Sequence, residues 1–287
     1  MKTNLGFVAL LFLPLCLHAQ VSDPALDAVF PTPMFVTIDV PGAVATRVNA
    51  INNSGRVVGG FDSSDGRTHA FSYSNGRFQE MVRPGFYAES YGVNDSDEVV
   101  GTFTPNFQYG FLFMAGAYRT LSFGFQGTYA AGINNNGDVV GAYWDVCCDL
   151  HGYLLQRPFA LTTFDYPGAD RTEAEGINEA GQIVGIWRDV NQVRHGYLLQ
   201  DGVFTSVDVP GATLTLALGI NSAGVIAGTF VDAAGASHGF LSHNGSFFTL
   251  DFPDAVSTEL SGINRLGIFA GAYTDTAGVQ HGFFGHR

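Results

Sequence analysis

Lysine is almost absent from this sequence of 287 residues, where it occurs once, at Lys2. The body of the chain therefore cannot supply a P-loop lysine, a Schiff-base lysine or a pyridoxal-phosphate lysine. The net charge is −13, with 13 Lys and Arg against 26 Asp and Glu. A chain this acidic lacks the basic surface that nucleic-acid binding requires, so we expect no nucleic-acid partner.

Cysteine is scarce as well, with three residues in the whole chain. Cys16 lies in the apolar start, and the other two, Cys147 and Cys148, are adjacent. This pair could form a strained vicinal disulfide, stay free or pair between chains. With so few cysteines, we expect the hydrophobic core to hold the fold together.

Long apolar runs are confined to the N-terminus, and none after residue 20 is long enough to span a bilayer. Residues 1–19 combine a short cationic start, an apolar stretch over residues 5–17 and a small residue, Ala19. This pattern predicts a secretory signal peptide that is cleaved after Ala19. We therefore expect a secreted protein, extracellular or periplasmic, with residues 20–33 as a linker.

Glycine, by contrast, is abundant, with 37 residues, and it marks an internal repeat. One unit recurs six times around the tripeptide Gly-Ile-Asn, with spacings of 42, 40, 44, 43 and 43 residues. Its asparagines are Asn52, Asn94, Asn134, Asn178, Asn221 and Asn264. A glycine follows at the same spacings, at Gly59, Gly101, Gly141, Gly185, Gly228 and Gly271.

Two further markers recur with the asparagine and the glycine. The first is a histidine followed by a small and an aromatic residue, at His69, His151, His195, His238 and His281, with Tyr109 replacing it in the second copy. The second is an Asp-x-Pro motif, at Asp39, Asp165, Asp208 and Asp251. One histidine per repeat is too widely spaced to share a metal ion. We expect each to bond a backbone group or the recurrent aspartate of its own or a neighbouring repeat.

The unit over residues 172–210 illustrates the local structure. Short β-prone runs at residues 172–177, 182–187, 195–199 and 203–209 are separated by turn residues, with no helical period. Four antiparallel strands in about 43 residues are typical of one propeller blade.

The two ends of the repeat region predict how the ring closes. The sixth unit has three strands, and an orphan strand at residues 35–40 matches the missing fourth. We therefore predict an all-β, six-bladed β-propeller of four-stranded antiparallel blades, forming one domain over residues 34–287. The N-terminal strand completes the last blade. An open β-solenoid is the alternative, and it would not need that strand.

The unit resembles the bacterial extracellular HAF repeat, which is named for a His-Ala-Phe signature. His69-Ala70-Phe71 shows the signature literally, and the other copies read His-Gly-Tyr or His-Gly-Phe. The resemblance covers nearly all of residues 35–287. It implies a secreted repeat protein and no particular reaction.

Function is expected where the repeats differ, and the first strand of each unit should face the channel. Two positions of that strand share one face. The first reads Arg47, Glu89, Tyr129, Glu173, Leu216 and Glu259, and the second reads Asn49, Tyr91, Ala131, Glu175, Leu218 and Ser261. Glu89, Glu173, Glu175 and Glu259 could together hold Ca²⁺ or another hard cation. A solvated channel wall and a paired-carboxylate acid/base site are the alternatives.

Copies one to three are irregular in the connections that should emerge on one face. These connections and their counterparts contribute a candidate ligand rim of Phe86, Tyr87, Phe107, Phe125, Trp144, Trp187 and Arg188. Exposed aromatic rings suit stacking on sugars or gripping a protein partner. The alternative is that several of them pack between blades.

No common catalytic motif accompanies these features, since the sequence has no Gly-x-Ser-x-Gly and no His-Glu-x-x-His. The leading hypothesis is a monomeric, non-enzymatic propeller that binds an extracellular carbohydrate or protein. A metal-assisted hydrolase or lyase acting in the channel is the second hypothesis. A structural surface or matrix component is the third.

Overall fold

The computed structural model describes residues 33–81, 87–123 and 127–287, and these residues form 24 strands and no helix. Accordingly, nothing in the described part is a helix long and apolar enough to cross a membrane. The predicted signal peptide (residues 1–19) lies outside the described residues. So does the predicted linker, apart from residue 33.

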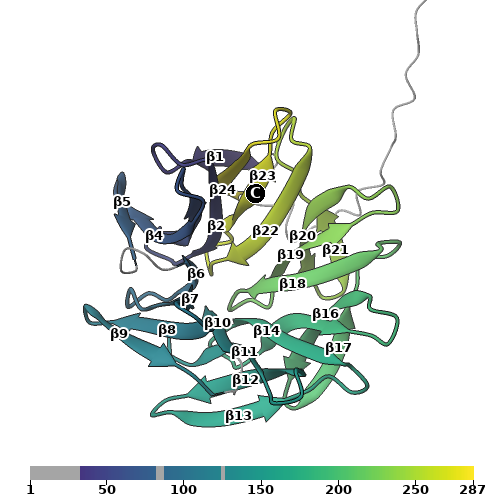
Figure 1. Ribbon diagram of the computed structural model, residues 1–287. Coiled ribbons are helices and arrows are strands. Elements are labelled where there is room, and N and C mark those ends of the chain that lie inside the picture. The colour runs from purple at the N-terminus through teal and green to yellow at the C-terminus, as the bar shows by residue number, and fades with distance from the viewer. Residues whose placement is uncertain (1–32, 82–86, 124–126) are drawn as a thin grey trace, which may run out of the picture.

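The strands form antiparallel sheets around a common axis (Figure 1). Four sheets have four strands each. The first contains β2 (Ala45–Ile51), β3 (Val57–Asp62), β4 (Thr68–Ser74) and β5 (Arg77–Glu80). The second contains β6 (Tyr87–Val93), β7 (Val99–Thr104), β8 (Tyr109–Met114) and β9 (Ala117–Leu121). The third contains β18 (Leu214–Ile220), β19 (Ile226–Val231), β20 (Ser237–His243) and β21 (Ser246–Thr249). The fourth contains β22 (Ser257–Ile263), β23 (Phe269–Thr274), β24 (Gln280–His286) and β1 (Met34–Ile38).

The remaining strands form one eight-stranded sheet, which corrects the expectation of six separate blades. Its first half is β10 (Gly127–Ile133), β11 (Val139–Trp144), β12 (Leu150–Gln156) and β13 (Ala160–Phe164). Its second half is β14 (Arg171–Ile177), β15 (Ile183–Arg188), β16 (Arg194–Gln200) and β17 (Val203–Val207). A parallel pairing of Leu150 with Arg171 joins the halves, because β14 begins beside the start of β12.

The two ends of the propeller meet in one sheet, as the orphan strand predicted. β1 pairs antiparallel with β24 from Met34↔His286 to Ile38↔Gly282. Phe35 packs between the rings of Phe252, Phe269 and Phe283, with centroid distances of 5.1–5.7 Å. The N-terminal strand therefore covers an edge of β24 that would otherwise be open.

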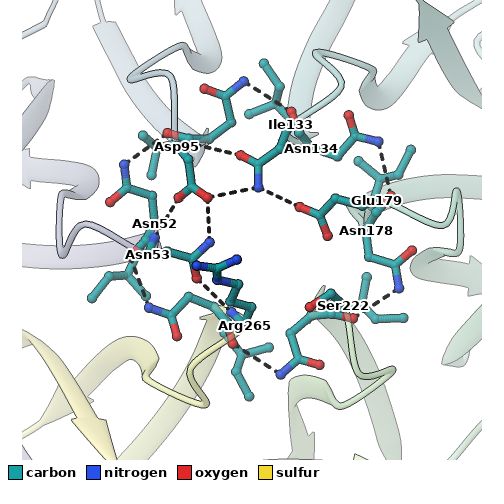
Figure 2. Close-up of a pocket in the computed structure, with 18 residues that line it drawn as sticks. Asn52, Asn53, Asp95, Ile133, Asn134, Asn178, Glu179, Ser222 and Arg265 are labelled. Atoms are coloured by element: carbon teal, nitrogen blue, oxygen red, sulfur yellow. Dashed lines mark hydrogen bonds between the residues drawn. The ribbon is translucent and has the colours of Figure 1, made fainter.

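A closed cycle of asparagine side chains joins the turns at one end of the axis (Figure 2). The Nδ2 of each repeat asparagine donates to the backbone carbonyl of the next one, at 3.0–3.1 Å. Asn264 closes the cycle by donating to the carbonyl of Asn52 at 3.0 Å. Each Oδ1 also accepts a backbone N–H of its own turn, as Asn221 does from Val225 at 3.0 Å. The open-solenoid alternative is therefore wrong.

The repeated histidines bind carboxylates, as expected from their spacing. The Nδ1 atoms of His151, His195, His238 and His281 lie 2.9–3.2 Å from Asp165, Asp208, Asp251 and Asp39, and His69 uses Glu80 at 2.9 Å. The imidazole of His281 also stacks on Tyr273. Burial opposes protonation of His281, but the hydrogen bonds and charges of Asp39 and Asp275 together outweigh it and raise the pKa of the imidazole. This pair adds a second tie between the chain's end and its first strand.

We expect a chain without residues 34–43 to be much less stable than one beginning at residue 20, the predicted mature N-terminus. The deletion removes the β1–β24 ladder and the packing of Phe35, worth at least about 3 kcal/mol. At about 2–4 °C per kcal/mol, Tm should fall by about 6–12 °C in a calorimetric scan. Equal melting of the two chains would contradict closure by β1.

A single ring contact is tested by Asn221→Asp, which keeps the acceptor oxygen and loses the amide donor. The Asn264 carbonyl loses its partner, and we expect unfolding in urea to cost about 1–3 kcal/mol less free energy than in the parent. The control is Asn244→Asp, because Asn244 occupies an exposed turn. Equal losses in both variants would argue against a role of the ring.

Candidate functional site

A β-bulge at the same place in each innermost strand presents side chains to the channel. In β14 the register shifts between Ala174 and Gly176, at Glu175. Opposite, a Cβ on Gly185 would overlap the carbonyl oxygen of Glu173, so a larger residue does not fit. The same overlap with the innermost strand recurs at Gly59, Gly101, Gly141, Gly228 and Gly271. The repeated glycine therefore permits the bulge.

The six bulge residues are those of the second channel position read from the sequence. They line a constriction of about 80 Å³: Asn49, Tyr91, Ala131, Glu175, Leu218 and Ser261. The prediction that this position faces the channel is confirmed.

A larger pocket of about 250 Å³, the wide pocket, lies at the channel end opposite the asparagine ring, next to the β7–β8 and β11–β12 connections. Its lining residues are Tyr91 (β6), Gln108 (before β8), Tyr129 (β10), Trp144 (β11), Glu173 and Glu175 (both β14). Tyr91 and Glu175 also line the constriction, so the pocket continues into the channel.

The carboxylates of the pocket share one hydroxyl donor. The Tyr129 hydroxyl lies 2.8 Å from Oε2 of Glu173 and 3.1 Å from Oε1 of Glu175. Burial, together with the negative charge of Glu173, raises the pKa of Glu175 to about 8. Burial and the two carboxylates raise the pKa of Tyr129, so its hydroxyl keeps its proton. The pocket therefore holds a carboxylate pair in which one member retains a proton to neutral pH.

Three other lining groups are available to a ligand. Within the described residues, the Tyr91 hydroxyl, the Trp144 indole N–H and the Gln108 side-chain amide make no hydrogen bond to protein. The Trp144 and Tyr129 rings lie at 54° with their centroids 6.0 Å apart. The pocket thus combines aromatic faces with unused donors and acceptors.

The four glutamates proposed as a cation site do not form one ligand set. Glu89 accepts hydrogen bonds from Asn49 at 2.9 Å and Arg47 at 3.4 Å, while Glu173 and Glu175 meet at Tyr129. Burial raises the pKa of Glu259, which does not line the pocket. Across the described ranges, no group of three or more His, Cys, Asp or Glu side chains is arranged to hold a metal ion. In the described structure the four glutamates of the predicted Ca²⁺ site therefore do not come together as one ligand set.

The predicted aromatic rim separates into different environments. Trp144 lines the pocket, and Phe107 and Tyr87 are exposed, by 58% and 45%. Trp187 is stacked between Tyr166 and His195, with centroid distances of 4.1 and 4.5 Å, so it packs within the protein, as the alternative allowed.

The other members of the rim prediction do not extend this surface. Arg188 is held by Asp170 at 2.6 and 2.9 Å, which fixes its guanidinium in an ion pair. Phe86 and Phe125 lie outside the described residues. Of the rim residues that the structure describes, Trp144 alone is shared with the pocket lining.

The adjacent cysteines lie in the β11–β12 connection that follows Trp144. In the described structure, Cys147 and Cys148 are exposed thiols and do not form the vicinal disulfide. The Cys147 backbone N–H instead donates to Asp145 at 2.8 Å, as part of the tight turn.

The asparagine end of the channel is lined by polar groups that bond to one another around a narrow pocket (Figure 2). Burial alone would raise the pKa of Asp95, but hydrogen bonds from Asn53 and Asn135 outweigh it and lower that pKa. Asn135 also donates to Glu179 at 2.7 Å. Because these groups satisfy one another, the wide pocket is the better candidate site.

Gln108 is the lining residue that the sequence argument missed. It follows Phe107 in an irregular loop and carries no repeat signature. Its only signal was its position beside an exposed aromatic ring.

Comparison with known proteins adds information on the fold. No protein-family model matches the chain, and no curated protein matches it. Among solved structures, a gluconolactonase from Xanthomonas campestris is 10% identical, with a TM-score of 0.58 over 93% of this chain and 94% of that one. Virginiamycin B lyase from Staphylococcus aureus is 10% identical, with a TM-score of 0.52 over 88% and 98%. A variant of the Aleuria aurantia lectin in complex with Fucα1-6GlcNAc is 8% identical, with a TM-score of 0.54 over 87% and 93%. These likenesses support the propeller fold.

Stability should depend on pH through Glu175. Its pKa is about 8 in the folded protein, whereas a glutamate in an unfolded chain titrates near 4.3. The folded state therefore binds the extra proton between these values, and stability falls as pH rises towards 8. We expect Glu175→Gln, which cannot ionise, to have a higher Tm than the parent at pH 8.5. The difference in Tm between variant and parent should be smaller at pH 5.

Differential scanning calorimetry at the two pH values measures this gap. The matched control is Glu179→Gln, because that carboxylate is exposed at the other end of the channel. A gap for Glu175→Gln that is the same at both pH values would contradict the burial of its charge.

Proposed function

We propose that the protein is a secreted carbohydrate-binding propeller whose site is the pocket lined by Trp144, Tyr129 and Glu173. The observation that carries this proposal is the combination of aromatic faces with carboxylates and unpartnered polar groups in one pocket. Aromatic rings cover the apolar face of a sugar, while carboxylates and amides accept and donate hydrogen bonds to its hydroxyls. A volume of about 250 Å³ suits a single sugar unit better than a protein segment.

The fold supports this proposal without deciding it. The Aleuria aurantia lectin, whose structure contains Fucα1-6GlcNAc, has a similar propeller. Its low identity transfers no residue to this chain, so the ligand class rests on the lining of the pocket.

We also propose that the propeller has six blades, with each half of the eight-stranded sheet forming one blade. The innermost strands β2, β6, β10, β14, β18 and β22 contact one another in a cycle. The asparagine ring has six members, and six repeat glycines make the same contact with the innermost strand. The parallel pairing of Leu150 with Arg171 is then a local contact between blades.

Secretion is part of the proposal, and it rests on the N-terminal pattern that ends at Ala19. The resemblance to extracellular HAF repeats supports it. Two exposed thiols, Cys147 and Cys148, would then face an oxidising compartment.

A hydrolase or lyase is the second candidate, and the Glu173–Tyr129–Glu175 arrangement favours it. Two carboxyl groups that share a hydroxyl, one retaining its proton, have the composition of a general acid and base. A gluconolactonase and a lyase are among the similar propellers. Turnover of a bound sugar or lactone, lost in Glu173→Gln, would favour this candidate over simple binding.

Trp144→Ala should weaken binding of any sugar found on a glycan array at least tenfold, about 1.4 kcal/mol, because a stacking face is lost. Isothermal titration calorimetry measures this change. Tyr118→Ala is the control: Tyr118 is 45% exposed on the outer strand β9, away from the channel. Retained binding in Trp144→Ala, or an equal loss in both variants, would refute this pocket as the site. Absence of any sugar ligand would leave the structural-component hypothesis in its place.

A further inference from the structure

The carboxylates in the wide pocket differ from most others near the channel, because no cation among the described residues contacts them. Glu89 has Arg47 at 3.4 Å, and Asp62 has Arg47 at 2.9 Å. In the described part of the chain, no ion pair reaches Glu173 or Glu175. Arg194 and Arg188 act on them only from beyond ion-pair distance, and Arg188 is held by Asp170. Within the described ranges, the pair therefore presents negative charge that no ion pair compensates.

The same pocket is lined by three aromatic rings, those of Tyr91, Tyr129 and Trp144. The face of an aromatic ring is electron-rich and attracts a cation placed over it. A positively charged group in this pocket would meet carboxylate oxygens and ring faces together. An anionic ligand such as a uronate would meet repulsion from both.

We propose that the pocket selects a protonated amine, and that its ligand is an amino sugar rather than a neutral or acidic one. This inference rests on the proposed function, since it takes sugar binding by the pocket as given. It specifies that the ligand carries the positive charge that would compensate Glu173 and Glu175.

A primary ammonium group fits these residues better than a quaternary one. Its N–H bonds donate to Oε2 of Glu173 and Oε1 of Glu175, which already converge on the Tyr129 hydroxyl. A quaternary ammonium has no N–H to donate. The sugar hydroxyls would then meet the Tyr91 hydroxyl, the Gln108 amide and the Trp144 indole N–H.

The charge of the whole chain acts in the same direction. Its net charge is −13, and the only lysine is Lys2, so cationic ligands are drawn towards the protein and anionic ones are repelled. This general field does not distinguish one site from another. The test therefore compares carboxylates inside and outside the pocket.

The experiment is isothermal titration calorimetry in phosphate buffer at pH 7, because amine buffers would compete. The probes are glucosamine, N-acetylglucosamine, glucose and cyclohexylamine, an amine with no sugar hydroxyls. For the parent protein we expect glucosamine to bind at least tenfold more tightly than the two neutral sugars, and also more tightly than cyclohexylamine. Equal affinity for glucosamine and the neutral sugars would overturn the inference and leave the proposed function intact.

Variants show whether the preference belongs to the pocket. The double variant Glu173→Gln with Glu175→Gln should reduce the preference for glucosamine over N-acetylglucosamine to within about threefold. Glu259→Gln is the matched control, because Glu259 holds the position equivalent to Glu173 but lies outside the pocket. It should keep the preference. An unchanged preference in the double variant would overturn the inference.

The remaining outcomes separate the two proposals. Equal binding of cyclohexylamine and glucosamine, with no neutral sugar bound, would support amine selection and overturn carbohydrate binding. Absence of binding by all four probes would overturn the inference for these ligands. A neutral sugar found on the glycan array would then still sustain the proposed function.

Discussion

The closed ring of asparagine amides is the constraint on which the rest of the structure depends. Each side chain braces its own turn through Oδ1 and reaches the next turn through Nδ2. A blade therefore cannot shift without breaking contacts with its neighbour. Because the ring closes at Asn264 and Asn52, the innermost strands converge and one end of the channel is narrow. The β1–β24 pairing and the His281–Asp39 contact hold the same closure at the outer part of the blade.

This scaffold places structural positions and variable ones on neighbouring strands. The repeated glycine, at Gly185 in β15, accommodates the carbonyl of the inner strand and permits the bulge. The bulge residue is then free to differ between copies, since it faces the channel rather than the core. The inner-strand residues that line the wide pocket come from the neighbouring strands β6, β10 and β14, whereas β18 presents Leu216 and Leu218. The pocket therefore lies on one side of the axis.

The pocket retains an electrostatic cost, because its two carboxylates lie close together without an ion pair to the described cations. Most of the repeated aspartates are tied to histidines, and Arg47 neutralises charge on the other side of the channel. Glu173 and Glu175 have a tyrosine hydroxyl instead. Burial and mutual repulsion raise the pKa of Glu175, which opposes folding in its ionised form. A cationic ligand would relieve this repulsion, so its binding free energy should be most favourable at such a site.

The repeat period, the turn residues and the matching end segments determined from sequence alone the all-β class, the strand order within a unit and the joining of the two ends. Local turn chemistry and period-two patterns carry that information. The channel position of Glu175 and Tyr91 also followed, because it depends on strand parity. Only the tertiary structure decided which carboxylates meet: Glu173 and Glu175 lie on one strand, whereas Glu89 is captured by Arg47. Trp187 and Trp144, by contrast, stand one register position apart on β15 and β11, so strand parity places them on opposite faces: one is stacked between Tyr166 and His195 and the other lines the pocket. Which carboxylates meet depends on distances between blades and on neighbouring side chains, which a repeat pattern does not encode.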